Sequence, residues 1–116
     1  MMKIVKWCIV ALVTVTLTTE GRSGPVLTVF GYGNQSCGSW TQERAAQSIV
    51  SEIMAGWVGA FVTGFEDGVN FEVGHGADGN GLAGWIDNYC RLHPLKDIFH
   101  ASEALVTALR GLPPLD

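Results

Sequence analysis

The segment IVSEIMAGWVGAFVTGF, residues 49–65, decides the fold class of this chain. Its apolar side chains recur every four residues in two neighbouring rows, which is the pattern of an α-helix with a wide apolar face. The first row is Ile49, Ile53, Trp57, Phe61 and Phe65, and the second is Ala46, Val50, Met54, Val58 and Val62. A face of this width is buried by more than one neighbour. The segment therefore predicts the central helix of an all-helical domain.

A ridge of small residues runs along the same segment, at Gly56, Ala60 and Gly64. Each glycine inside a helix costs up to about 1 kcal/mol relative to alanine, so close packing should offset that cost. We expect another helix of the same chain to pack on this ridge. The alternative is that a second copy of the protein packs there.

Before this segment, the sequence predicts an irregular leader and then the start of the helix. Ser39 is the expected N-cap, with Gln42 at capping-box spacing and Thr41 as a competing cap, and the helix is expected to continue to about Phe65. Residues 22–38 form the leader. Its apolar run at residues 26–30 either pairs as a short strand or lies on the core, and the second interpretation is favoured.

The chain after the central helix predicts a loop and two further helices. Residues 67–81 contain five glycines with polar residues between them, which indicates a mobile surface loop. Asp78 and Asn80 begin a calcium-loop pattern, but a third ligand and the terminal glutamate are missing, so we expect one of them to cap the next helix. That helix ends at Pro94, where a third helix opens and continues to Gly111.

The two later helices have recognisable faces. The first presents an apolar face of Leu82, Trp85, Ile86, Tyr89 and Cys90 and a polar face of Asp87, Asn88 and Arg91. Asp87 and Asn88 either line a polar site or face solvent, and the second interpretation is favoured. The positions with helical spacing after Pro94 are Leu95, Ile98, Phe99, Ser102, Leu105, Val106 and Leu109. Together these patterns predict three main helices.

The N-terminal residues have the parts of a secretory signal peptide. Lys3 and Lys6 give it a positive start, residues 7–17 are apolar, and small and polar residues follow. The apolar part is too short to span a bilayer, which takes about 20 residues. We expect cleavage after Gly21, or up to three residues later, which leaves residues 22–116 as a single exported domain. An uncleaved interfacial anchor is the alternative.

Loss of the signal peptide removes Cys8 and leaves Cys37 and Cys90 as one pair in an exported domain, where oxidising conditions favour a disulfide. A bridge that closes a loop of about 54 residues contributes roughly 4 kcal/mol on the chain-entropy model. The two cysteines lack Cys-x-x-Cys spacing, so a structural role is expected rather than a redox role.

Charge and spacing exclude several functions. The expected mature chain has five basic and ten acidic residues, a formal net charge of −5, which excludes nucleic acid as a partner. The residue types of a hydrolase are present, but no spacing assembles them, and the three histidines lack metal-ligand spacing on one helix. We therefore expect no enzymatic activity, no cofactor and no metal site. The residues of the types that a hydrolase would need are Ser39, His75, His93, His100, Asp87 and Asp97.

Four motifs together resemble a known family. They are Cys37-Gly38-Ser39-Trp40, the Trp57 to Gly64 segment, Trp85-Ile86-Asp87-Asn88-Tyr89-Cys90 and His93-Pro94. Their order is similar to that of the Rap/Tai type VI secretion immunity proteins, which share the architecture of the acid-stress chaperone HdeA. The resemblance implies a periplasmic helical protein that binds and blocks an amidase effector that cleaves the cell wall, often as a homodimer.

A protein partner is thus the expected ligand, with no membrane contact after signal cleavage. The residues expected to bind this partner are His75, Asp78, Asn80 and Asp87. The alternative function is an HdeA-like chaperone, which exposes apolar surface when its carboxylates are protonated. Only 16% of this chain is charged, and few of its acids are clustered to act as such a switch.

Overall fold

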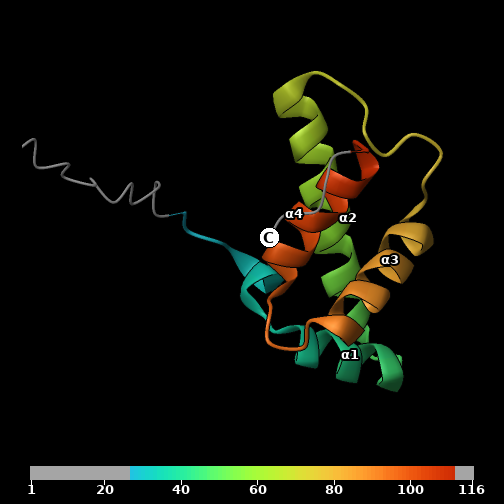
Figure 1. Ribbon diagram of the computed structural model, residues 1–116. Helices are drawn as coiled ribbons and strands as arrows, with labels where there is room; N and C mark the ends of the chain where they lie inside the picture. Colours follow the sequence, from blue (N-terminus) through green and yellow to red (C-terminus); the bar gives the residue numbers. More distant parts are fainter. Residues whose placement is uncertain (1–26, 112–116) are drawn as a thin grey trace, which may run out of the picture.

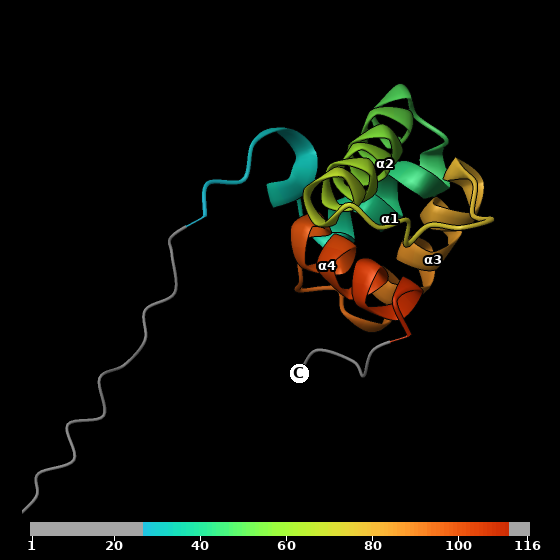
Figure 2. The ribbon, with the colours of Figure 1, turned by 90° about the horizontal axis from the view of Figure 1, so that it is seen from above.

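The computed structural model describes residues 27–111, which form an all-helical domain (Figure 1). A 3₁₀ helix, η1 (Gly31–Asn34), is followed by α1 (Cys37–Ala46), α2 (Ile49–Val69), α3 (Gly79–Leu92) and α4 (Ile98–Leu109). Seen from above, α2, α3 and α4 surround a common core and α1 crosses beneath it (Figure 2). The prediction of a small, disulfide-linked helical domain is confirmed, with α1 as a separate addition to the three main helices. The expected signal peptide, its cleavage site and Cys8 lie outside the described residues.

The helix expected over residues 39–65 is in fact two helices, α1 and α2. Gln47 ends α1 in the left-handed conformation, with φ of 50°, and Ser48 caps α2 by accepting a backbone N–H of its first turn at 3.1 Å. Ser36, and not Ser39, is the N-cap of α1. A serine side chain competes with the helix for backbone N–H groups, which favours a cap over a helix interior. The prediction of one unbroken helix was therefore wrong.

The most deeply buried apolar side chains of α2 belong to its second apolar row, and Trp57, Phe61 and Phe65 of the first row are partly buried against the core. Met54, Val58 and Val62 are buried, whereas Ile49 of the first row is 75% exposed. The buried side chains that the other helices contribute include Trp40, Ile86, Ile98, Ala101, Leu105 and Val106. By length and composition alone α2 could also cross a membrane, but a core helix of a soluble protein passes the same test. Because α2 packs against α1, α3, α4 and η1, we interpret it as the central helix of the domain.

The predicted disulfide joins Cys37 to Cys90 and links the start of α1 to the last turn of α3. Both cysteines are buried. Beside the bridge, the backbone N–H of Cys37 donates to the carbonyl of Lys96 at 2.7 Å, and that of Ile98 donates to the carbonyl of Gln35 at 2.9 Å. These contacts fix the start of α1, the end of α3 and the start of α4 to one another.

η1 packs against α2 through Trp57. The indole Nε1 donates to the carbonyl of Phe30 at 2.8 Å, and the ring covers Gly33. A Cβ at Gly33 would lie 2.5 Å from Cη2 of Trp57, so a side chain does not fit there. Leu27 and Phe30 are exposed, so the expectation that their apolar run covers the core was wrong.

The ends of α3 and α4 follow from their caps. Asp78 caps α3, as expected, and α3 ends before Pro94. α4 begins at Ile98 with Asp97 as its N-cap, and not at Pro94. Leu95 consequently precedes the helix and is 99% exposed, which corrects its expected place on an apolar helix face.

Candidate functional site

Asp87 of α3 is bonded to two side chains of α1. Its Oδ1 accepts hydrogen bonds from Nε1 of Trp40 at 2.7 Å and Nε of Arg44 at 2.9 Å, and its Oδ2 accepts one from Nη2 of Arg44 at 2.8 Å. Trp40 and Arg44 are four residues apart, so they project from the same side of α1. The hydrogen bond from Arg44 is the main cause that lowers the pKa of Asp87, against the opposing effect of desolvation.

This arrangement corrects the sequence interpretation of Asp87. The carboxylate does not simply face solvent, because both oxygens are engaged within the chain. We therefore do not propose Asp87 as a contact for a partner. It instead holds α1 against α3 and keeps the guanidinium of Arg44 in place at the border of a groove.

The groove lies between α2 and the start of α3, next to Arg44, and has a volume of about 430 Å³. Ala55, Gly56 and Gly59 of α2 line it, and Asp78 and Asn80 contribute from α3. A Cβ added at either glycine would meet nothing within 4 Å. The glycines are thus not required for packing within the chain.

The ridge of small residues on α2 is also uncovered toward the C-terminal end of the helix. A Cβ at Gly64 would also meet nothing within 4 Å, and Ala60 is exposed. No helix of the described residues 27–111 packs on this ridge. The expectation that the ridge serves packing within the chain was wrong.

The α2–α3 loop, residues 70–78, is held by a carboxylate of α2. Oε1 of Glu66 accepts hydrogen bonds from the backbone N–H groups of Val73 at 2.9 Å and Gly74 at 2.7 Å. The side chain of Val73 is buried and Asn70 ends α2 in the left-handed conformation. The loop expected to be mobile is therefore attached to the domain at its middle by both polar and apolar contacts.

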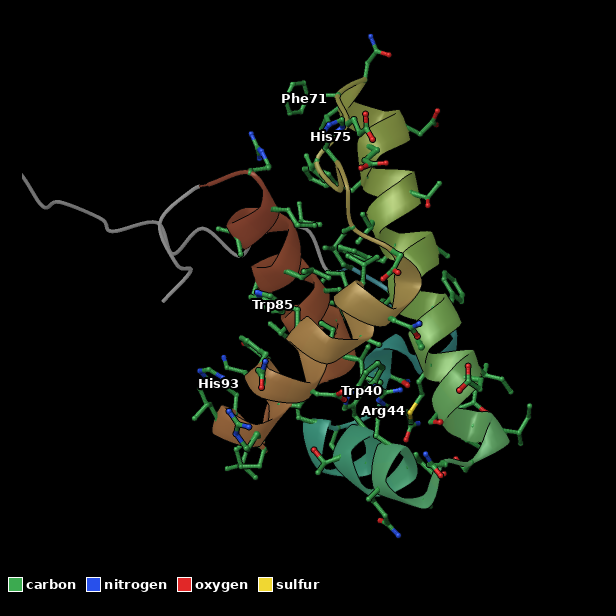
Figure 3. The ribbon with its side chains drawn as sticks, turned by 90° about the vertical axis from the view of Figure 1, so that its right-hand side faces the viewer. Trp40, Arg44, Phe71, His75, Trp85 and His93 are labelled. Atoms are coloured by element: carbon green, nitrogen blue, oxygen red, sulfur yellow. A yellow bond between two sulfur atoms is a disulfide. The ribbon has the colours of Figure 1, made fainter. Side chains whose placement is uncertain are left out.

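Two side chains of this loop project outward at one end of the molecule, as Figure 3 shows for Phe71 and His75. Phe71 is 66% exposed. The side chain of His75 is 87% exposed, and its Nδ1 lies 3.4 Å from a carboxylate oxygen of Glu72. Of the four residues expected to bind a partner, Asp78 and Asn80 share the groove, Asp87 supports Arg44 beside it, and His75 lies apart on the loop.

Other polar contacts in the described part of the chain serve the fold. Oδ1 of Asp97 accepts from the backbone N–H of His100 at 2.8 Å and lies 2.6 Å from its Nδ1, which is an N-cap contact. Among residues 27–111, no three His, Cys, Asp or Glu side chains are grouped closely enough to hold a metal ion. The groove and the outward side chains of the α2–α3 loop are therefore candidate features for recognition.

Arg44 and Phe71 were not predicted from the sequence as residues of a site. The spacing of Trp40 and Arg44 by four residues could have indicated a shared face, but nothing in the sequence places Asp87 opposite them. Phe71 directly follows Asn70, the left-handed residue that ends α2, and nothing in the sequence places its side chain outside the core.

No protein-family model, curated protein or solved structure matches this chain.

Proposed function

We propose that this protein is an exported binding protein of the immunity type, which inhibits a secreted amidase that cleaves the cell wall, and that it works in the periplasm. The observation that supports this most is Phe71, an exposed aromatic side chain on a loop whose backbone is bound to the domain through Glu66. The resemblance of the cysteine and tryptophan motifs to immunity proteins supports the same function.

An exposed aromatic residue on a fixed loop has the properties of an interface anchor. Aromatic side chains are frequent among the few residues that dominate binding energy at protein interfaces. Because the hydrogen bonds of Glu66 already fix the backbone at Val73 and Gly74, less conformational entropy is lost when a partner binds. Phe71 is therefore the residue that we expect to enter a cleft of the partner.

The charge around Phe71 indicates the kind of cleft. Glu66, Asp67, Glu72 and Asp78 lie at the end of α2, in the α2–α3 loop and at the start of α3, while Arg110 is the basic residue packed near Phe65 on this side. An acidic surface is complementary to a partner with basic residues around its cleft, which increases the rate of association. The proposed target is thus an enzyme with a basic rim.

The test is capture and inhibition with the oxidised protein. The protein is immobilised, exposed to periplasmic and secreted extract, and any retained amidase is assayed on purified peptidoglycan with and without it. We expect one amidase at a one-to-one ratio and loss of its activity. Phe71→Ala should weaken binding by about 30-fold, as for a hot-spot residue.

Leu95→Ala is the matched control, because Leu95 is also an exposed apolar side chain but belongs to the α3–α4 connection. It should bind the amidase as the wild type does. Equal binding by wild type and Phe71→Ala would refute the role of the loop. Retention of many unfolded proteins only at low pH, with no amidase, would instead support the chaperone.

A further inference from the structure

We propose that the α3–α4 turn, residues 91–96, docks this protein on a membrane surface that contains anionic phospholipids. The turn reads Arg91-Leu92-His93-Pro94-Leu95-Lys96. The inference is independent of the proposed function, and it departs from the expectation of no membrane contact after signal cleavage.

Two exposed leucines lie between two exposed cations in this turn. Leu92 is 70% exposed and Leu95 is 99% exposed, and both Arg91 and Lys96 are exposed beside them. A single exposed leucine needs no explanation, because much of any protein surface is apolar. Leucines between basic residues on one short turn are typical of segments that lie at a membrane interface, where hydrocarbon and phosphate are close together.

The backbone of the turn is fixed by several contacts. The disulfide at Cys90 directly precedes it, and the carbonyl of Lys96 accepts from the backbone N–H of Cys37 at 2.7 Å. The ring of His93 stacks on Tyr89 with centroids 4.2 Å apart, and its Nδ1 lies 2.9 Å from the carbonyl of Tyr89. The leucines are thus presented outward without an ordering cost on docking.

The acidic residues of the protein do not prevent this contact. The acidic α2–α3 loop lies at the other end of α3, a helix of about 20 Å, and charges this far apart are screened at physiological ionic strength. Figure 3 shows the same separation, with Phe71 and His75 at one end of the molecule and His93 toward the other. Asp97, next to Lys96, is engaged by His100.

A lipid surface fits this turn better than an acidic protein does. Acidic side chains of a protein would pair with Arg91 and Lys96 but would leave Leu92 and Leu95 against polar groups. A bilayer interface accommodates both kinds of side chain at once. Two leucines and two cations give a partition coefficient on the order of 10⁴ M⁻¹, similar to that of one myristoyl chain, so the docking is reversible.

The test is co-sedimentation of the exported, oxidised protein with vesicles, after mass spectrometry has established its N-terminus. Vesicles of phosphatidylcholine are compared with vesicles in which about one third of the lipid is phosphatidylglycerol. We expect binding to the anionic vesicles that is at least about tenfold stronger. The variants with Leu92→Ser and Leu95→Ser, or with Arg91→Gln and Lys96→Gln, should each lose about tenfold or more of it.

Phe71→Ser is the matched control, because it removes an exposed apolar side chain at the opposite end, and it should bind vesicles as the wild type does. Circular dichroism checks that each variant is folded. Binding that is unaffected by both double substitutions would overturn the proposal. So would an absence of binding to anionic vesicles.

Discussion

Replacement of Asp87 tests whether its carboxylate holds α1 against α3. Trp40 is fully buried, and its Nε1 donates to Asp87. Asp87→Ala leaves this buried donor without its acceptor, which costs about 1–3 kcal/mol. The ion pair with Arg44 adds less than about 1 kcal/mol, because roughly a third of each side chain is exposed. We expect a total loss of about 1–4 kcal/mol in the free energy of unfolding.

Asp87→Asn is the matched control. The amide oxygen can still accept from Trp40, but the charge that pairs with Arg44 is gone, so a loss of about 1 kcal/mol is expected. Urea unfolding followed by circular dichroism measures both variants. The difference between them reports the Trp40 hydrogen bond. If Asp87→Ala costs less than about 0.5 kcal/mol, the reasoning from the buried indole is refuted.

The difference in stability between wild type and Asp87→Asn should depend on pH in a definite direction. The pKa of Asp87 is lower in the folded protein than in the unfolded chain, chiefly because of the hydrogen bond from Arg44. Its charge therefore stabilises the fold above the ordinary carboxyl pKa, and this contribution is lost as the pH falls through the folded-state value. The advantage of wild type over Asp87→Asn should be constant near neutral pH and shrink below about pH 4. An advantage that grows on acidification would contradict the assignment.

Four further substitutions test the packing of the domain. Gly33→Ala should lower the free energy of unfolding by about 1–3 kcal/mol, because its Cβ would meet the ring of Trp57. Gly56→Ala, whose Cβ meets nothing within 4 Å, should raise it by up to about 1 kcal/mol. Urea unfolding curves measure both variants, and a change of the same sign in the two would contradict this. Trp57→Ala should cost about 3 kcal/mol, and a loss below about 1 kcal/mol would show that η1 packing is unimportant. Cys37→Ser should lower Tm by about 15–30 °C by removing the bond to Cys90, and wild-type melting curves unchanged by reductant would refute this.

Much of the fold was predictable because its strongest signals are local. The spacing of Met54, Val58 and Val62 identified the central helix, and Asp78 identified the start of α3. The break between α1 and α2 was missed because the apolar rows continue across Gln47 and Ser48. This periodicity was given more weight than the capping preference of Ser48. Such a polar pair interrupts a helix when the serine side chain accepts a backbone N–H of the following turn, as Ser48 does from Ser51.

The candidate site was less predictable because it depends on contacts distant in sequence. The spacing between Arg44 and Asp87 carries no local pattern, so only the packing of α1 on α3 brings them together. The same is true of Glu66, which fixes Val73 and Gly74 across the end of α2. Glycine content suggested a mobile loop, whereas one carboxylate supplies acceptors for two backbone N–H groups.

The contact between α1 and α3 also bears on the two functions considered. An acid-activated chaperone exposes apolar surface when protonation separates its parts. Among the described residues, Asp87 is the carboxylate whose pKa is lowered. It joins α1 to α3, and the disulfide between Cys37 and Cys90 joins the same two helices. Protonation of Asp87 would remove the charge that pairs with Arg44, but it could not part helices that remain covalently linked. The double link therefore predicts that α1 and α3 stay together in acid, so any apolar surface exposed at low pH would have to come from other contacts.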